Sequence, residues 1–254
     1  MKQYVLTLAV TALLCSNATA QNKVKNVYTE VQSLNIEQVQ NTEQTSQLCR
    51  YLMAGYNTLC LPMSLSAEQL NAAGITAERF AAVRQEGSTL QLYFVDCTAE
   101  GIEAGIPYLI YSSKAQYLRI KNTEADHIAT ELRTIRLNDG QGNQVAFSSS
   151  WDKKQREGLY GIPAKQNTTP LESILIRTTA DLSFLPTRCG FNWEQQSATA
   201  QHLAIIHATA AETTAIQSVS NDNAAATDTY DLQGRKHSSP VKGVNIINGK
   251  KVVR

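Results

Sequence analysis

The sequence lacks the short motifs by which common hydrolases, metalloproteases and nucleotide-binding enzymes are recognised. It contains no G-x-S-x-G, no H-E-x-x-H and no glycine-rich phosphate-binding loop. Its cysteines form no C-x-x-C pair, and the Asp139–Asn143 segment lacks the ligand spacing of a calcium loop. We therefore predict no catalytic, cofactor-binding or metal-binding residue, and the sequence favours a non-catalytic role.

Charged and aromatic residues are also sparse, at 18% and 7% of the chain, whereas 43% of the residues are hydrophobic. This composition is typical of an ordered globular protein and excludes global disorder. No apolar run is long enough to cross a bilayer as a helix, so we predict no integral membrane span.

The first twenty residues have the three parts of a secretory signal peptide. Lys2 supplies the positive charge, residues 4–14 form an apolar run, and Ala18-Thr19-Ala20 forms an A-x-A cleavage site. We expect the mature chain to begin at Gln21. The predicted location is therefore outside the cytoplasm, either secreted or at the outer membrane and cell surface, after passage through the periplasm.

The small net charge of +1 conceals an asymmetry between the end of the chain and the rest. Residues 230–254 contain six basic residues and one acidic residue, whereas residues 21–229 contain 16 basic and 21 acidic residues. In an exported protein, a basic tail favours contact with the anionic bacterial envelope over nucleic acid. The alternative is that the tail is simply a solvated terminus.

The body of the protein, residues 21–207, consists of short apolar runs that are separated by turn signals every eight to twelve residues. This pattern predicts an all-β fold, an antiparallel β-sandwich or open barrel. One short helix is expected over 67–73, because Ser66 and Gln69 form a capping box and Gly74 suits the helix end. Residues 208–229 have the composition of a linker, and residues 230–254 follow as a small C-terminal β module.

Two hairpins are expected within the body. The apolar runs around Ala54-Gly55 predict a hairpin with a two-residue turn, in which Cys49 faces Cys60. Opposed cysteines at such positions lie within disulfide range, so Cys49 and Cys60 are a candidate disulfide, the alternative being that Cys60 is a buried free thiol. The second hairpin turns at Glu86-Gly87-Ser88, and NDGQGN at 138–143 is a further turn.

Titratable side chains provide only weak candidates for chemistry. His202 and His207 are five residues apart on an expected strand, so they point to opposite faces and cannot share a metal. Glu100 with Glu103 or Asp96 could be drawn as a glycosidase pair, but solvated turn acids are the better interpretation. Each histidine, including His127 and His237, is interpreted as a surface residue.

Aromatic side chains in turn-rich stretches are the remaining candidates for a binding surface. They are Trp151, Tyr160, Phe191 and Trp193, and each has charged neighbours in the sequence. The alternative for each is that its ring folds onto the core beneath a loop.

The C-terminal segment carries a recognisable set of features. It contains Tyr230-Asp231-Leu232-x-Gly234-Arg235-Lys236, then Pro240, Lys242-Gly243 and Asn248-Gly249-Lys250-Lys251-Val252-Val253. This set resembles the C-terminal sorting modules of cargo for the Bacteroidetes type IX secretion system, and residues 214–219 resemble the strand that precedes them. Asn245 stands where these modules often have an aromatic residue. The resemblance implies recognition by secretion machinery at the outer membrane through Asp231, Gly234, Arg235, Gly243, Gly249 and Lys250.

Part of the body also resembles a β-rich module of secreted and surface proteins of the same bacteria. The matching stretches are residues 56–62, 67–70 and 101–110. This resemblance implies surface location and a β-fold, and it carries no catalytic residues with it.

These observations together favour an exported, surface-displayed protein with a binding or adhesion role, similar to an adhesin or hemagglutinin. The expected partners are the secretion machinery and either lipopolysaccharide or a host glycan or protein. Two rivals stay open, namely a secreted hydrolase with an unrecognised active site and an inhibitory or structural module that acts on another secreted protein.

Overall fold

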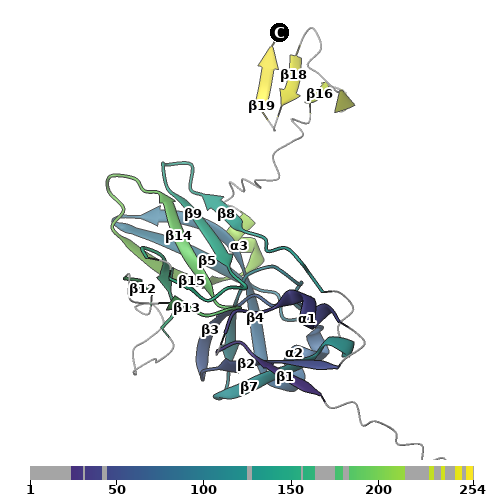
Figure 1. Cartoon of the computed structure of the whole chain (residues 1–254). Coiled ribbons are helices and arrows are strands. Elements are labelled where there is room, and N and C mark those ends of the chain that lie inside the picture. The colour runs from purple at the N-terminus through teal and green to yellow at the C-terminus, as the bar shows by residue number, and fades with distance from the viewer. Residues whose placement is uncertain are drawn as a thin grey trace, which may run out of the picture.

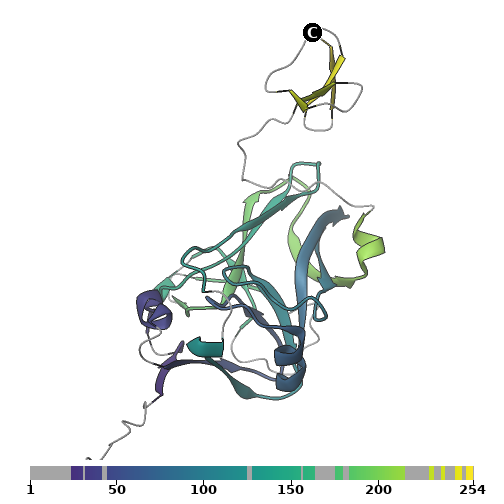
Figure 2. The same ribbon diagram turned by 90° about the vertical axis from the view of Figure 1, so that its right-hand side faces the viewer.

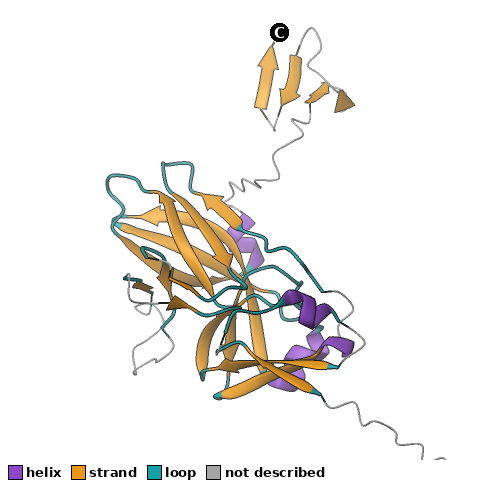
Figure 3. Ribbon diagram, viewed as in Figure 1, coloured by secondary structure: helices purple, strands orange, loops and turns teal. Residues whose placement is uncertain are grey.

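The computed structural model confirms a predominantly β-fold with a few short helices (Figures 1 and 3). It describes residues 24–163 except 31, 42–44, 125–127 and 156, then residues 175–179 and 183–214, and finally the strand residues 229–231, 236–237, 244–247 and 250–253.

Short strands dominate the secondary structure, and the helices between them are brief. In chain order, the elements are β1 (Lys25–Tyr28), α1 (Ile36–Gln40), β2 (Ser46–Leu52), β3 (Gly55–Leu59), α2 (Ala67–Ala73), β4 (Ile75–Glu86), β5 (Thr89–Asp96), β6 (Tyr108–Ser112), β7 (Gln116–Lys121), η1 (Asn122–Glu124), β8 (Ile135–Asn138), β9 (Gln144–Ser149), β10 (Lys154–Gln155), β11 (Tyr160–Gly161), β12 (Ile176–Arg177), β13 (Ser183–Phe184), β14 (Cys189–Gln195), β15 (His202–Ala208), α3 (Ala210–Thr214), β16 (Thr229–Asp231), β17 (Lys236–His237), β18 (Val244–Ile247) and β19 (Lys250–Val253).

Three sheets build the body. A three-stranded sheet has the order β1-β2-β7, the central sheet has the order β15-β5-β4-β6-β3, and the outer sheet has the order β12-β11-β14-β9-β8. Two pairs, β1 with β2 and β15 with β5, are parallel, and the other pairs in these sheets are antiparallel. The short strands β10 and β13 form a separate pair.

The central sheet is buried on both faces. Leu109 and Ile110 are neighbours on β6 and both are fully buried, yet Leu109 belongs to one hydrophobic cluster and Ile110 to the other. Successive side chains of a strand point to opposite faces, so each residue enters a different core. One core lies against the three-stranded sheet and α2, and the other lies against the outer sheet.

The central sheet is also strongly curled. Strands β3 and β15 are its two ends in hydrogen-bonding order, but the rings of Tyr56 on β3 and His207 on β15 stack with centroids 4.7 Å apart. A register shift between Phe80 and Ala82 interrupts the pairing of β4, and such bulges bend a strand. Figure 2 shows the bend of β4, the long blue strand. This curl suits the open-barrel form of the predicted fold.

The helix expected over 67–73 is confirmed with both of its end signals. The Ser66 side chain accepts a hydrogen bond from the Gln69 N–H, the Gln69 side chain returns the contact, and Gly74 ends the helix with φ +64°. The helices α1 and α3 were not predicted, because five residues are too few to show a helical period. Among the described residues, no helix has both the length and the apolar character needed to cross a bilayer.

The two hairpin predictions have opposite outcomes. Strands β4 and β5 pair across Gly87-Ser88 as expected, with Glu86 opposite Thr89. The hairpin at Ala54-Gly55 is wrong, because β2 pairs with β1 and β7 whereas β3 pairs with β6. The Asn57 side chain bonds both the N–H and the C=O of Met53, so it closes a corner at which the chain passes from one sheet to another.

The predicted Cys49–Cys60 disulfide is wrong as well, because it depended on that hairpin. Cys49 lies opposite Tyr28 and Arg119 in the three-stranded sheet, whereas the Cys60 N–H donates to the Thr187 carbonyl near the outer sheet. All four cysteines of the described region, Cys49, Cys60, Cys97 and Cys189, are free and buried. Cys60 is therefore a buried thiol, which was the alternative interpretation.

Backbone strands of the C-terminal segment form a sheet of their own with the order β17-β16-β18-β19. Asp231 lies opposite Asn245 and Lys250 lies opposite Ile247. The other residues of the sorting-like motif, Gly234, Arg235, Gly243 and Gly249, fall outside the described residues, as do residues 215–219. The predicted domain boundaries stay predictions.

We predict that the native protein is inert to thiol reagents near neutral pH and loses stability in alkali. Burial raises the pKa of Cys97 and of Cys189 from 9.0 to about 12, and burial also raises the pKa of Cys60. Because these folded-state pKa values are raised, their contribution to stability is fully present below about pH 9 and is lost as the pH rises toward 12. Denaturant midpoints measured across this range should fall with pH.

Thiol titration with a chromogenic disulfide provides the second readout. At about pH 8 the folded mature chain should show almost no reaction, and the denatured chain should show four reactive thiols. Rapid labelling of any of the four in the folded protein would contradict the burial on which the prediction rests.

Candidate ligand-binding groove

The candidate site follows strand β14 of the outer sheet, which the hydrophobic core holds in place. Phe191 on β14 stacks on Phe147 of β9 with a centroid distance of 4.4 Å and an interplanar angle of 9°. Phe80 and Phe94 of the central sheet pack against this pair with centroids 5.8 to 6.1 Å away. Since side chains alternate along a strand, Asn192 and Glu194 then face away from the core.

A single ring fixes β11 beside β14. Phe184 lies so close to Gly161 and Gly190 that a Cβ atom on either glycine would be 2.8 or 2.9 Å from its Cζ atom. The two glycines therefore leave the space that the Phe184 ring occupies, and the ring replaces the missing side chains. This packing places Tyr160 of β11 directly opposite Phe191.

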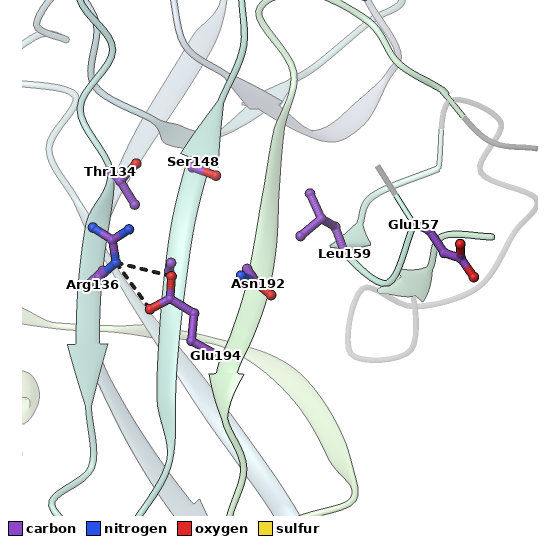
Figure 4. A pocket seen from close by; sticks show the side chains of 8 residues that line it. Thr134, Arg136, Ser148, Glu157, Leu159, Asn192 and Glu194 are labelled. Carbon is purple, nitrogen blue, oxygen red and sulfur yellow. Dashed lines mark hydrogen bonds and ion pairs between the residues drawn. The ribbon is translucent and has the colours of Figure 1, made fainter. Parts of the chain in front are cut away.

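The first part of the groove lies over the exposed face of β8, β9 and β14 and has a volume of about 390 Å³ (Figure 4). Arg136 reaches across β9, and its Nε lies 3.2 Å from both carboxylate oxygens of Glu194. Gln144 donates to the same carboxylate at 3.1 Å. Figure 4 shows Asn192 beside this pair, with Leu159 and Glu157 across the opening.

The second part of the groove has a volume of about 490 Å³ and continues from the first, since Glu157 and Asn192 line both. Its lining adds Tyr160 and Trp193, whose ring centroids are 6.3 Å apart at an angle of 62°, and its exposed surface is mostly polar. The remaining side chains are polar, namely Arg177, Gln196 and Gln201. We call the two parts together the β14 groove.

The four aromatic candidates of the sequence separate into two groups. Tyr160 and Trp193 line the β14 groove while also packing partly against the core. Phe191 is fully buried, and Trp151 packs against both hydrophobic clusters with its indole N–H buried. Phe191 is therefore a core residue at an inward position of β14, and the half-buried Trp151 packs onto the core from the loop after β9, as the alternative interpretation held.

The polar residues of the groove were missed from the sequence. Arg136 and Glu194 are far apart in the chain, and the same holds for Glu157 and Gln201. None lies in a motif, so the only available signal was the alternation of Asn192 and Glu194 with Phe191 and Trp193.

The acidic residues near the start of the 101–110 stretch are exposed, as the sequence predicts. Glu100 and Glu103 are exposed turn acids, paired with Arg79 at 2.6 Å and Arg133 at 3.8 Å. No group of three or more metal-ligating side chains occurs in the part of the chain that the structure describes. His202 is exposed, and His127 and the side chain of His237 lie outside the described set.

His207, interpreted from the sequence as a surface residue, contacts two other side chains. Its Nδ1 lies 2.7 Å from Oε2 of Glu78, its ring stacks on Tyr56, and Tyr56 contacts Tyr111 with centroids 5.0 Å apart. Burial, with the nearby Glu78 and Tyr111, raises the pKa of Tyr56. A carboxylate at Nδ1 favours the tautomer that carries its proton there, which leaves Nε2 as an acceptor.

Comparisons with known proteins add no relative, since no family model, no curated protein and no solved structure matches the chain.

We predict that Gly161→Ala destabilises the β11–β14 junction by about 1–3 kcal/mol, because the new methyl group must displace the Phe184 ring. Chemical denaturation measures the change in the free energy of unfolding. In a Phe184→Leu background the added cost of Gly161→Ala should be clearly smaller, because a leucine side chain can yield the space. Equal costs in the two backgrounds would show that the Phe184 ring does not hold these strands together.

Proposed function

We propose that the protein is exported, displayed at the cell surface or released from it, and binds a saccharide in the β14 groove. The observation that carries this proposal is the concentration of charged and amide side chains along one opening, beside the partly buried Tyr160 and Trp193. A sugar presents apolar C–H faces and a rim of hydroxyl groups. Aromatic side chains contact the C–H faces, and guanidinium, carboxylate and amide groups hydrogen-bond the hydroxyl groups.

The chemistry of the groove suits a neutral, hydroxyl-rich ligand. Arg136 already engages Glu194 through both oxygens, so this charge pair is internally balanced. Arg177 and Glu157 bring one charge of each sign to the second part, beside the amides of Asn192, Gln196 and Gln201. Asn and Gln side chains offer both a donor and an acceptor, as each hydroxyl group does.

Export is supported by the sequence at both ends of the chain. The signal peptide at 1–20 directs the chain across the inner membrane, and the basic segment 230–254 resembles a type IX sorting module. A binding role at the surface, of the adhesin or hemagglutinin kind, is consistent with these two targeting signals. Secretion machinery is then the first partner, and a glycan of the envelope or of a host is the second.

One observation favours the rival, a secreted hydrolase. Glu78 and His207 form a carboxylate–imidazole pair beside Tyr56, and such a pair orients a general base. The pair lies on the central sheet. His207 lines an opening of about 490 Å³ together with Tyr93 and Glu212, whereas Glu78 does not line it. We rank this candidate second because, among the described residues, no serine, threonine or cysteine side chain is hydrogen-bonded to His207.

Glycan arrays and red-cell agglutination test the binding proposal. The mature chain should bind at least one glycan, and Arg177→Gln or Asn192→Ala should weaken that binding about tenfold, as expected for a lost hydrogen bond to a charged or amide group. Arg84→Gln, which alters an exposed arginine on β4, is the matched control and should bind as the unchanged chain does. An array without any bound glycan, or unchanged binding by both groove variants, contradicts the proposal.

Cell fractionation tests the proposed location and the role of the C-terminal segment in sorting. The intact chain should reach the cell surface or medium, whereas a chain that lacks residues 214–254 should stop in the periplasm. If both chains reach the same compartment, the tail is not a sorting signal in this protein.

A further inference from the structure

The exposed face of the three-stranded sheet carries a cluster of tyrosines that the β14 groove does not include. The other face of this sheet packs into the core through Val27, Leu48 and Leu118. Tyr51 on β2 lies opposite Tyr117 on β7, and Tyr28 on β1 lies opposite Cys49, two residues from Tyr51. One ring therefore comes from each of the three strands.

The three rings contact one another but stay open to solvent. Tyr117 is the central ring, with centroids 5.7 Å from Tyr28 in an edge-to-face arrangement and 5.1 Å from Tyr51. Tyr28 is 38% exposed and Tyr117 is 40% exposed, which places both among the few large apolar side chains at the surface. Tyr28 and Tyr117 stand on the two outer strands but are in ring contact, so the three rings form a compact cluster over β2.

Polar groups frame the tyrosine face. The Arg119 guanidinium lies 5.3 Å from the centroid of the Tyr117 ring, and the amides of Gln47 and Asn26 bond each other at 3.2 Å. Lys121 is paired with Glu124 at 2.9 Å. Among the residues that the structure describes, no carboxylate pairs with Arg119, so within this set its positive charge beside the central ring is uncompensated.

We propose that this tyrosine face is a second binding surface and that its ligand is an acidic polysaccharide. Sugar rings would stack on Tyr117 and Tyr28 while a uronate-type carboxylate pairs with Arg119, and hydroxyl groups would bond the amides of Gln47 and Asn26. Charge complementarity with Arg119 selects an acidic saccharide over a neutral one.

The proposal does not depend on the β14 groove. The tyrosine face belongs to β1, β2 and β7, at the lower end of the body in Figure 1, whereas the groove belongs to the outer sheet above. A chain with two such surfaces on different sheets can bridge two ligand molecules. That property is what agglutination by a single chain requires.

Immobilised polygalacturonate is the probe, with neutral dextran and polyglutamate as the two reference polymers. The mature chain should bind polygalacturonate and should not bind polyglutamate, which lacks the sugar rings. Dextran lacks the carboxylate, so Arg119→Gln should leave any binding of dextran unchanged. Tyr117→Thr and Arg119→Gln should each weaken binding about fivefold to tenfold, and Arg119→Gln should also remove most of its salt dependence.

Matched controls separate this surface from the rest of the molecule. Tyr111→Thr changes a tyrosine that is 41% exposed on β6, and Arg84→Gln changes an exposed arginine on β4, so both should bind as the unchanged chain does. Arg177→Gln in the β14 groove should also leave polygalacturonate binding intact, which distinguishes this proposal from the first. Thermal unfolding confirms that each variant is folded.

Three results would overturn the proposal: no binding of polygalacturonate by the folded mature chain, equal binding of polyglutamate, or folded Tyr117→Thr and Arg119→Gln variants that bind without loss.

Discussion

One cluster of rings organises the core behind the outer sheet: Phe147 stacks on Phe191, and Phe80 and Phe94 pack against this pair. These four rings join the outer sheet to the concave face of the central sheet. Aromatic contacts of this kind add to the large apolar area that the rings bury. They also decide which face of β14 points outward, and that face carries the polar residues of the β14 groove.

The central sheet transmits this constraint through the molecule because both of its faces are buried. Leu109 faces the phenylalanine core, and Ile110 faces the core beneath the three-stranded sheet. A slip of one residue in β6 would exchange the two sides and place both in the wrong core. Because both faces of the central sheet are buried, the outer sheet with the β14 groove and the three-stranded sheet with the tyrosine face are packed against the same central sheet.

A buried charge of the three-stranded sheet, Arg50, lies near Arg188 and Cys189 at the start of strand β14 of the outer sheet. Arg50 lies on the inward face of β2 and is almost completely buried, with Nη1 bonded to Glu30 at 3.2 Å and to the Tyr51 carbonyl at 2.6 Å. Burial lowers its pKa to about 10, and the nearby Arg188 contributes to the same shift. Thr187, beside Arg188, is fully buried with φ +67°. This strained residue, next to the half-buried Arg188, marks where the chain enters β14.

The sequence by itself determined the elements whose signals are local. The helix at 67–73, the β4–β5 hairpin and the β-rich class follow from capping residues, a turn glycine and the alternation of apolar residues, which act within a few positions of the chain. Tertiary structure alone decided the partners. The sequence of strands β2 and β3 predicts one hairpin, because no local signal indicates that Asn57 closes a corner between two sheets.

Phe191 and Trp193 have the same pattern in the sequence, and only packing distinguishes a buried ring from one that lines a groove. The same holds for Tyr28, Tyr51 and Tyr117, since long-range strand pairing brings together residues whose separation in the chain carries no signal.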